Sequence, residues 1–466
     1  RRAFLAHLRQ MIEAASADAV IAPQSFSGWV SEACEGLKLR FAGPLSALPT
    51  APAGGASVPG TTPEALAYLQ FSSGSTRFPR GAAVTQAAIM ANTHGIVHDG
   101  LQAGDGDRCT NWLPMYHDMG LVGFMLAPLS CHISVDYLPT DEFGRRPLTW
   151  LHLISRNRAT LSYSPSFGYG LCARRANRGA PDTLDLSSWR VAGIGGDMIR
   201  PDVLQRFSDT FAGAGFDARA WVASYGMAEA SLALSFAPLN SGLRVDVLDS
   251  QRLEADNQAW LLSTAAGRRS RAFVHCGPIL PHHEVQIRDA AGRTVAEHQV
   301  GTIFVRGPSL MREYFGDPLE SARVLSADGW LNTGDLGYLN GGEIVITGRA
   351  KDLIILNGRN IWPQDLEWTI EAEVAGLRSG SVAAFAIDAE PADEVVILIE
   401  RRSRDDEALR IAAAAALRSH HGVGAKVVLV GLHSLPRTSS GKLSRAKARQ
   451  CYLSGELDDQ RVGASA

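Results

Sequence analysis

Short apolar runs alternate with amphipathic stretches over most of the chain. Five runs have the length and composition of buried strands: 68–71, 108–113, 134–138, 159–162 and 191–194. Three stretches carry apolar residues at helical spacing: 87–98, 147–156 and 200–214. Ahead of them, the sequence predicts a helix at the start and a short strand at 19–22, followed at 44–62 by a linker rich in Pro, Ala and Gly. Strands that alternate with helices predict an α/β fold with a parallel sheet.

The pattern changes after residue 281. Three segments alternate like the strands of a smaller β-rich unit: 284–288, 301–306 and 343–347. From residue 352 onward, four predicted strands (353–356, 381–387, 395–400 and 427–430) surround a helix at 405–421 that begins with acidic residues and ends before Gly422. We therefore predict a large domain, residues 1–350, that contains a β-rich subdomain at about 281–347, and a small α+β domain, residues 351–466.

Composition excludes several classes of protein. The 466 residues are 45% apolar and 20% charged, which is typical of a globular protein. Lys and Arg (45) nearly balance Asp and Glu (48), so a globally basic nucleic-acid binder is not expected. The six cysteines form no CxxC pair, and no apolar run is long enough to span a bilayer. We expect a cytoplasmic protein with reduced thiols. Because Arg1 opens directly into a periodic segment, we also expect that an upstream part of the large domain is missing.

The segment 71–81 (FSSGSTRFPRG) carries the first chemical signal. It follows a predicted strand and places four hydroxyl side chains around one glycine. Backbone N–H groups and hydroxyls in such a loop can surround a polyphosphate. The GxxxxGK[ST] pattern of a Walker loop is absent. The alternative interpretation is a Ser/Gly-rich surface turn.

Two further segments place polar side chains in apolar surroundings. In 112–120 (WLPMYHDMG), His117 precedes Asp118; a packed histidine with a satisfied partner is the alternative. In 224–230 (SYGMAEA), Tyr225 offers a ring for a purine and Glu229 offers a carboxylate for Mg²⁺. Its alternative is a helix-start turn with a solvated glutamate.

Three later segments add an acid and cations. In 332–337 (NTGDLG), Asp335 is a suitable acceptor for ribose hydroxyls, although a plain β-turn fits as well. The segment 347–352 (TGRAKD) places Arg349 and Lys351 where the domain character changes, and 438–443 (TSSGKL) carries Lys442. Solvated charged loops are the alternatives for these two segments.

Taken in this order, the six segments resemble the adenylate-forming superfamily of acyl-CoA synthetases, peptide-synthetase adenylation domains and luciferases, over residues 68–455. They are most similar to its fatty acyl-AMP ligases. Most acyl-CoA synthetases carry Thr-Gly-x-Pro-Lys-Gly in the phosphate loop, whereas this chain has TRFPRG at 76–81. The long stretch at 243–271 resembles the ligase-specific insertion, which is proposed in that family to restrain domain rotation and disfavour CoA.

The resemblance implies a reaction. A medium- or long-chain fatty acid would attack the α-phosphorus of ATP in the presence of Mg²⁺, releasing pyrophosphate and leaving an acyl-adenylate. The acyl group would then pass to the phosphopantetheine thiol of an acyl carrier protein. Two alternatives stay open: a fatty acyl-CoA ligase, and a non-catalytic module that binds acyl-adenylates or lipids.

The resemblance also implies roles for individual residues. Lys442 would bridge the acyl carboxylate and the α-phosphate, His117 would line the junction of the two substrate pockets, and Glu229 would bind Mg²⁺. Lys351 would be the hinge between the domains. The implied ATP- and AMP-binding residues are Ser72, Ser73, Gly74, Ser75, Thr76, Arg80, Gly195, Gly196, Asp197, Tyr225, Gly226, Met227, Ala228, Asp335 and Arg349.

Overall fold

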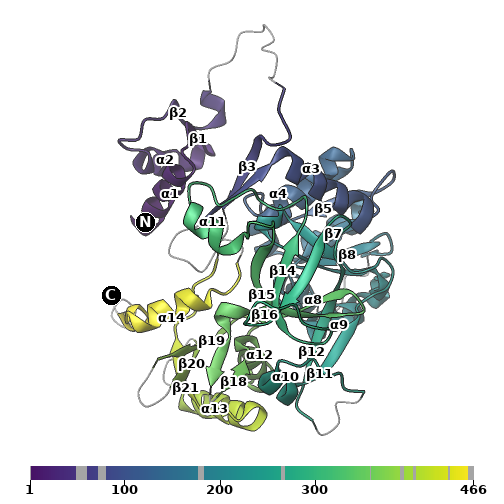
Figure 1. Ribbon diagram of the computed structural model, residues 1–466, viewed down its shortest axis with the longest axis vertical. Helices are drawn as coiled ribbons and strands as arrows, with labels where there is room; N and C mark the ends of the chain where they lie inside the picture. Colours follow the sequence, from purple (N-terminus) through teal and green to yellow (C-terminus); the bar gives the residue numbers. More distant parts are fainter. Residues whose placement is uncertain are drawn as a thin grey trace.

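The computed structural model describes residues 2–48, 60–71, 80–176, 183–263, 268–356, 358–388, 393–401, 406–438 and 441–459. A small N-terminal unit lies beside the main body (Figure 1). It consists of the helices α1 (Arg2–Ala14) and α2 (Ser27–Ala33) and the parallel strands β1 (Ala19–Ile21) and β2 (Phe41–Gly43). The hydrophobic residues Ile12, Val30 and Cys34 form its core.

The large domain is built around a six-stranded sheet with the strand order β10-β9-β8-β7-β5-β6. Its strands are β5 (Arg108–Asn111), β6 (Ser134–Tyr137), β7 (Leu161–Ser164), β8 (Val191–Ile194), β9 (Trp221–Gly226) and β10 (Ala233–Phe236). All are parallel except β10, so the predicted α/β class with a parallel sheet is confirmed. The carboxyl ends of the parallel strands meet at one edge, where α/β proteins place their ligands.

Helices cover both faces of this sheet (Figure 1). They are α3 (Gln86–His94), α4 (Asp118–Leu121), α5 (Ala127–Ser130), α6 (Thr140–Arg145), α7 (Leu148–Asn157), α8 (Ser166–Ala176) and α9 (Pro201–Phe211), with π-helical turns η3 (Gly95–Gly100) and η4 (Val122–Leu126). The predicted helix 87–98 is therefore α-helical only to His94. Large aromatic rings, among them Trp150, Tyr169 and Trp221, fill the space under α7–α9 in edge and tilted contacts.

A second six-stranded sheet is antiparallel and has the order β11-β12-β16-β15-β14-β13. Its strands are β11 (Val245–Asp249), β12 (Ser270–Pro278), β13 (Glu284–Arg288), β14 (Gly301–Arg306), β15 (Leu331–Asn340) and β16 (Glu343–Arg349). Two of them, β11 and β12, come before residue 281, where we expected the β-rich unit to begin. The hairpin β3 (Leu66–Phe71) and β4 (Gly81–Thr85) and the helices α10 (Ser250–Asp256) and α11 (Pro318–Val324) complete the large domain.

The small domain is the predicted α+β unit. Its strands are β17 (Ile354–Leu356), β18 (Arg359–Ile361), β19 (Val382–Ile387), β20 (Glu394–Glu400) and β21 (Ala425–Val430), and its helices are α12 (Pro363–Glu373), α13 (Glu407–His421), α14 (Arg445–Leu453) and α15 (Glu456–Asp459). Side chains alternate between the faces of the central sheet. Val396 and Leu398 face α14, whereas Ile397 and Ile399 face α12 and α13. Asp406 caps α13, and Gly422, with a φ of +65°, ends it as predicted.

Charged side chains join the two domains through the segment 243–271, which we compared with the ligase-specific insertion. Glu254 pairs with Arg269 of its own segment and with Arg359 of the small domain, both at 2.6 Å. The buried Arg271 guanidinium pairs with Asp365 of α12 at 2.7 Å. The segment therefore bridges the large and small domains directly.

The same junction predicts an acid-sensitive step in stability. Burial, together with the positive charges of Arg269 and His420, lowers the pKa of His421 from 6.5 to about 4. Between pH 6.5 and about pH 4, His421 is protonated in the unfolded chain but stays neutral in the folded chain. The contribution of His421 is therefore fully present above pH 6.5 and is lost as the pH falls to 4, by up to about 3 kcal/mol.

Urea unfolding at intervals between pH 4.5 and 7 measures this step. We expect His421→Asn to flatten the pH dependence relative to the unaltered chain, and His152→Asn, which removes an exposed histidine of α7 in the large domain, to leave it unchanged. Asp365 and Glu371, whose pKa values burial raises to about 6 and about 7, titrate in the same range with the opposite sign. The difference in pH dependence between His421→Asn and the unaltered protein therefore isolates the contribution of His421. Equal slopes in all three proteins would refute the assignment.

Among the described residues, no helix combines the length and apolar character needed to cross a membrane. All six cysteines are free thiols, and Cys34, Cys109, Cys172 and Cys276 are buried.

Candidate active site

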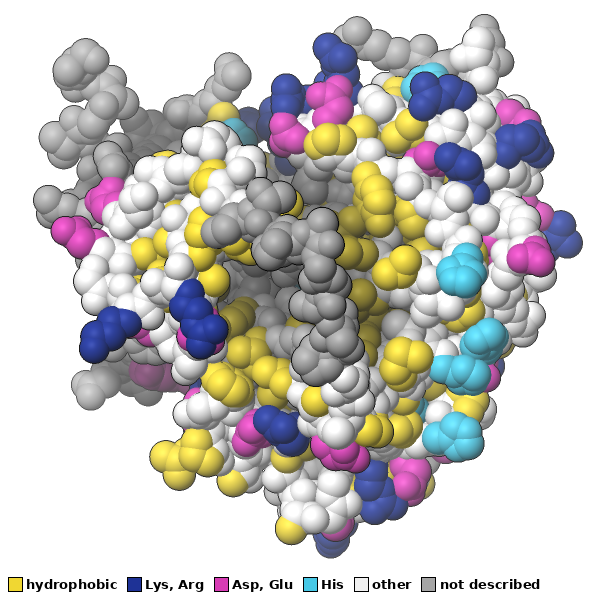
Figure 2. Space-filling view, turned by 90° about the horizontal axis from the view of Figure 1, so that it is seen from above, with side chains coloured by type: hydrophobic (Ala, Val, Ile, Leu, Met, Phe, Trp, Pro, Cys, Tyr) yellow, Lys and Arg dark blue, Asp and Glu magenta, His cyan; other side chains and the backbone are white. Residues whose placement is uncertain are grey.

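A cavity of about 760 Å³ lies at the carboxyl ends of the parallel strands, where both sheets of the large domain meet the small domain. One part of its wall is polar and the other is apolar. Seen from above, hydrophobic side chains border a hollow in the middle of the molecular face (Figure 2). The cavity contains nearly every predicted site residue that the structure describes: Arg80, His117, Gly196, Asp197, Tyr225, Gly226, Met227, Ala228, Glu229, Asp335, Arg349, Lys351 and Lys442.

The first polar group in the cavity consists of Asp335, Arg349 and Tyr225, and the register of two strands brings the first two together. Asp335 on β15 lies opposite Arg349 on β16, so the antiparallel pairing brings the carboxylate and the guanidinium together, with Arg349 Nε and Asp335 Oδ1 2.9 Å apart. The Tyr225 hydroxyl at the end of β9 donates to the other carboxylate oxygen at 2.7 Å. Burial and the charge of Asp335 raise the pKa of Tyr225 well above its usual value, so the hydroxyl stays a donor. This arrangement offers a fixed acceptor beside an aromatic ring, which suits a nucleoside.

Glu229 supplies the second polar group. It lies in the 3₁₀ turn η7 (Ala228–Ala230), and its Oε1 accepts a hydrogen bond from the Tyr314 hydroxyl at 2.7 Å. No group of three His, Cys, Asp or Glu side chains in the described ranges is placed to bind a metal ion. A single carboxylate nevertheless fits Mg²⁺, which proteins commonly hold with one or two carboxylates plus substrate phosphates and water. Glu229 would be the protein ligand, and the ion would offset phosphate charge.

Arg80 lies immediately before β4, close to Glu229 and Tyr314. Its Nη1 pairs with Glu320 Oε2 at 3.0 Å, and its guanidinium lies 5.7 Å from the centre of the Tyr314 ring. The guanidinium therefore lines the cavity next to Glu229, as expected for a residue that binds phosphate. The preceding phosphate-loop residues, Ser72, Ser73, Gly74, Ser75 and Thr76, lie outside the described residues.

His117 and Asp118 form a close pair between the polar and apolar parts. The nearest nitrogen and oxygen, His117 Nδ1 and Asp118 Oδ1, are 2.5 Å apart. Burial alone would raise the pKa of Asp118, but the hydrogen bond and charge of His117 and the charge of Lys442 outweigh it and lower that pKa. Asp118 is therefore a buried anion that fixes the imidazole and attracts the lysine.

The turn after β8 brings the backbone close to the small domain. Gly196 adopts a φ of +78°, and a Cβ atom there would lie 2.7 Å from the Met119 sulfur and 3.8 Å from the Lys442 ammonium nitrogen. A Cβ on Gly195 would lie 2.9 Å from the Ser224 carbonyl oxygen, so this residue does not line the cavity but allows the turn to pack against β9. The ammonium group of Lys442, a residue of the small domain, therefore lies beside a glycine turn of the large domain.

The apolar part extends down the face of the main sheet. Tyr163 and Leu161 of β7 line it together with Cys109 of β5, which is paired in register with Leu161. Phe124 and Phe236 add aromatic walls. From Ser164 at the carboxyl end to Leu161, β7 spans about 10 Å at roughly 3.3 Å per residue. The apolar part of the cavity is therefore a slot along the sheet, and His117 and Lys442 lie in the wall of the same cavity.

Sequence reasoning missed Tyr314 and the contacts that cross between domains. Tyr314 lies in no motif that we singled out, and only its tertiary contact with Glu229 reveals its role. The predicted hinge residue Lys351 lies in the turn η8 (Ala350–Asp352), directly after β16, and lines the cavity.

Comparison with known proteins agrees with this geometry. Residues 5–315 match the family model described as AMP-binding enzyme. A Caulobacter vibrioides protein, provisionally named an acyl-CoA synthetase, is 55% identical over 462 residues, which cover 98% of this chain and 80% of its own length. JamA of Moorena producens, named a medium-chain-fatty-acid–[acyl-carrier-protein] ligase, is 34% identical over 414 residues, covering 86% and 70%. A solved structure from work on fatty acyl-adenylate ligases of E. coli and L. pneumophila is similar with a TM-score of 0.91 at 43% identity, covering 98% and 82%.

The fold and these relatives place the protein in the class of adenylate-forming ligases, which activate acyl groups. The chain belongs to the AMP-binding enzyme family. The resemblance to fatty acyl-AMP ligases that the motifs indicated is thereby confirmed. Enzymes of this family use ATP, usually with Mg²⁺.

Proposed function

We propose that this protein activates a fatty acid as its acyl-adenylate and then transfers the acyl group to the phosphopantetheine thiol of an acyl carrier protein, so that a thioester forms and AMP leaves. The position of Lys442 carries the proposal. Its ammonium group lies beside Gly196 and near the buried anion Asp118, at the point where the apolar slot meets the nucleotide-binding residues. A carboxylate at the top of the slot and the α-phosphate of ATP would both contact it.

The first step forms one bond and breaks one bond. A carboxylate oxygen of the fatty acid attacks the α-phosphorus, and the bond to the bridging oxygen breaks as pyrophosphate leaves. Tyr225 and Asp335 would hold the nucleoside, Arg349 would support Asp335, and Glu229 would bind Mg²⁺ on the phosphates. Lys442 would neutralise the charge that builds on the α-phosphate oxygens, which is the main catalytic task in phosphoryl chemistry of this kind.

The acceptor assignment rests on two observations. JamA, whose name specifies transfer to an acyl carrier protein, is similar over most of the chain. A second cavity of about 220 Å³, with walls that include Trp112 and Phe167, adjoins the first and shares His117 and Lys442 with it. An extended thiol arm would reach the adenylate through this space.

A fatty acyl-CoA ligase is the second candidate function, favoured by the name of the Caulobacter relative. The charged bridge from the segment 243–271 to the small domain supports the carrier-protein assignment instead. By analogy with the ligase-specific insertion, the contacts of Glu254 and Arg271 would restrain the rotation that a CoA-dependent step needs.

Pyrophosphate release tests the activation step. We expect the protein to release pyrophosphate from Mg·ATP with dodecanoic acid and to form dodecanoyl-AMP in equal amount. Dodecan-1-ol, which has the same chain without a carboxylate, is the matched control and should release none. If a folded sample releases no pyrophosphate with acids of any length, the proposal is wrong, and a non-catalytic binding module becomes the better description.

A further inference from the structure

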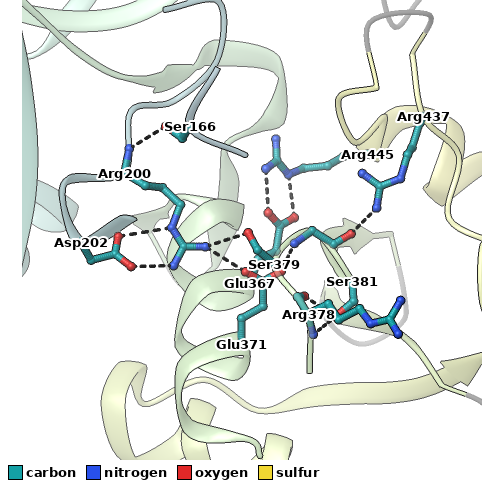
Figure 3. Close-up of polar contacts among 11 residues, drawn as sticks. Ser166, Arg200, Asp202, Glu367, Glu371, Arg378, Ser379, Ser381, Arg437 and Arg445 are labelled. Carbon is teal, nitrogen blue, oxygen red and sulfur yellow. Dashed lines mark hydrogen bonds and ion pairs between the residues drawn. The ribbon is translucent and has the colours of Figure 1, made fainter. Parts of the chain in front are cut away.

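A continuous polar network crosses the domain junction from Arg200 of the large domain to Arg437 of the small domain (Figure 3). We call the described residues Arg437, Thr438, Gly441 and Lys442 the lysine turn. Thr438 and Lys442 close it: the Thr438 N–H donates to the Lys442 carbonyl at 2.8 Å, and the Lys442 N–H donates to the Thr438 hydroxyl at 3.2 Å.

Arg437 holds this turn against the rest of the small domain. Its Nη1 donates to the Gly441 carbonyl at 3.2 Å, and its Nη2 donates to the Gly380 carbonyl at 2.6 Å. Gly380 lies in the loop between α12 and β19 with a φ of +75°. One guanidinium therefore fixes the position of the lysine turn relative to this loop.

The Gly380 loop is in turn tied to the large domain. The Gly380 N–H donates to Glu371 Oε1, and Glu371 Oε2 accepts from Arg200 Nη1 at 3.0 Å. Arg200 also donates to the Ser379 hydroxyl at 3.3 Å, and its guanidinium lies 5.0 Å from the centre of the Trp368 ring. The side chains of Arg200 and Glu371 are only 14% and 5% exposed, so this ion pair is largely shielded from solvent.

Arg200 is itself held from three sides. Its guanidinium also pairs with Asp202 at 3.0 Å, and its backbone N–H donates to the Ser166 hydroxyl at 3.1 Å. It lies only four residues after Gly196, on the same loop between β8 and α9. That loop therefore comes near the lysine turn at two points. At Gly196, an added Cβ atom would lie 3.8 Å from the Lys442 ammonium nitrogen, and at Arg200 the loop is linked to the turn through the network.

We propose that Arg200 and Arg437 are positioning residues for Lys442, linked through Glu371 and Gly380 so that the lysine turn is set in place when the two domains close in the orientation seen here. The proposal rests on the proposed function, because it takes Lys442 as the lysine that drives adenylate formation. Rotation of the small domain would break the Arg200–Glu371 pair and release the turn. Domain orientation and lysine placement would then be a single event.

Loss of either arginine should reduce the rate constant rather than substrate binding. We expect Arg437→Ala to lower kcat for acyl-adenylate formation by about 10- to 100-fold, the cost of a displacement of about 1 Å in a catalytic group. KM for ATP should change little, because Arg437 donates to the Gly441 and Gly380 carbonyls and contacts none of the nucleotide-binding residues that the structure describes. Arg200→Ala and Glu371→Gln should act in the same direction. Arg449→Ala is the matched control, since Arg449 on α14 likewise donates to a backbone carbonyl, that of Ala386, but lies outside the network.

The closing experiment combines a kinetic cycle with hydrogen exchange. If Arg437 acts through Lys442, Arg437→Ala should add no further loss in a Lys442→Ala background. Exchange of amides in peptides covering 436–444 should accelerate in Arg437→Ala and in Arg200→Ala but not in Arg449→Ala. Additive kinetic losses, or unchanged exchange in both network variants, would overturn the proposal. Faster exchange in a protein that forms no adenylate at all would support the link while refuting the proposed function.

Discussion

Replacing Lys442 with alanine should lower the rate of acyl-adenylate formation by about 10²–10³-fold, the cost of removing one preorganised charge from a developing oxyanion. The ammonium group lies beside Gly196 and within the influence of the buried Asp118. No other residue of the lysine turn brings a cation to this point. ATP should still bind, because Tyr225, Asp335 and Arg349 belong to the large domain.

Single-turnover formation of acyl-AMP, with ATP binding measured separately by calorimetry, tests this expectation. Lys447→Ala is the matched control, since Lys447 lies five residues further along the small domain with its side chain exposed. Adenylate formation at a near-normal rate in Lys442→Ala would remove the lysine from the mechanism. A parallel loss of ATP affinity would assign it to ground-state binding instead.

Replacing Asp335 with alanine should reduce kcat/KM for ATP by about 10- to 100-fold, the range that corresponds to one lost hydrogen bond to a charged group. The side chain is buried and accepts from both Tyr225 and Arg349. Removal therefore deprives ATP of an acceptor for its ribose and leaves the guanidinium without its partner. The effect should appear mainly in KM, because the ribose lies away from the reacting phosphorus.

ATP analogues that lack one ribose hydroxyl distinguish recognition from a loss of structure. The unaltered enzyme should discriminate against 3′-deoxy-ATP or 2′-deoxy-ATP, and Asp335→Ala should not. Asp289→Ala is the control, because Asp289 likewise pairs with an arginine, Arg293 at 2.8 Å, but lies directly after β13 and outside the cavity. Undiminished discrimination in Asp335→Ala would show that the ribose is held by other groups.

The sequence predicted those elements whose burial, start or end is determined by residues within the element or next to it. The strand β8 is a continuous apolar run buried on both faces, and α13 carries its own start and stop signals in Asp406 and Gly422. The motif residues were predicted to act together, and the described ones do converge. Asp335 and Arg349 meet because they are opposite each other in one register.

Other features have no local signal. The strand β9 ends within the motif around Tyr225. The sequence of that motif is typical of a turn, so it gives no sign that the strand continues to Gly226. The π-helical turn η3 follows α3 without a break in polarity, and its last residue, Gly100, is close against the Phe236 ring, which lies more than a hundred residues away. The pair Arg200–Glu371 joins residues 171 positions apart. Contacts of this kind depend on how the domains meet, which no window of sequence contains.

The fate of the adenylate decides between a carrier protein and CoA as the acyl acceptor. One reaction of protein, Mg·ATP and dodecanoic acid is divided into three, with no acceptor, with CoA, and with a phosphopantetheinylated acyl carrier protein, and the products are identified by mass spectrometry. We predict acyl-AMP that persists with CoA and disappears as the carrier protein becomes acylated. Efficient formation of dodecanoyl-CoA, with an unmodified carrier protein, would contradict this prediction.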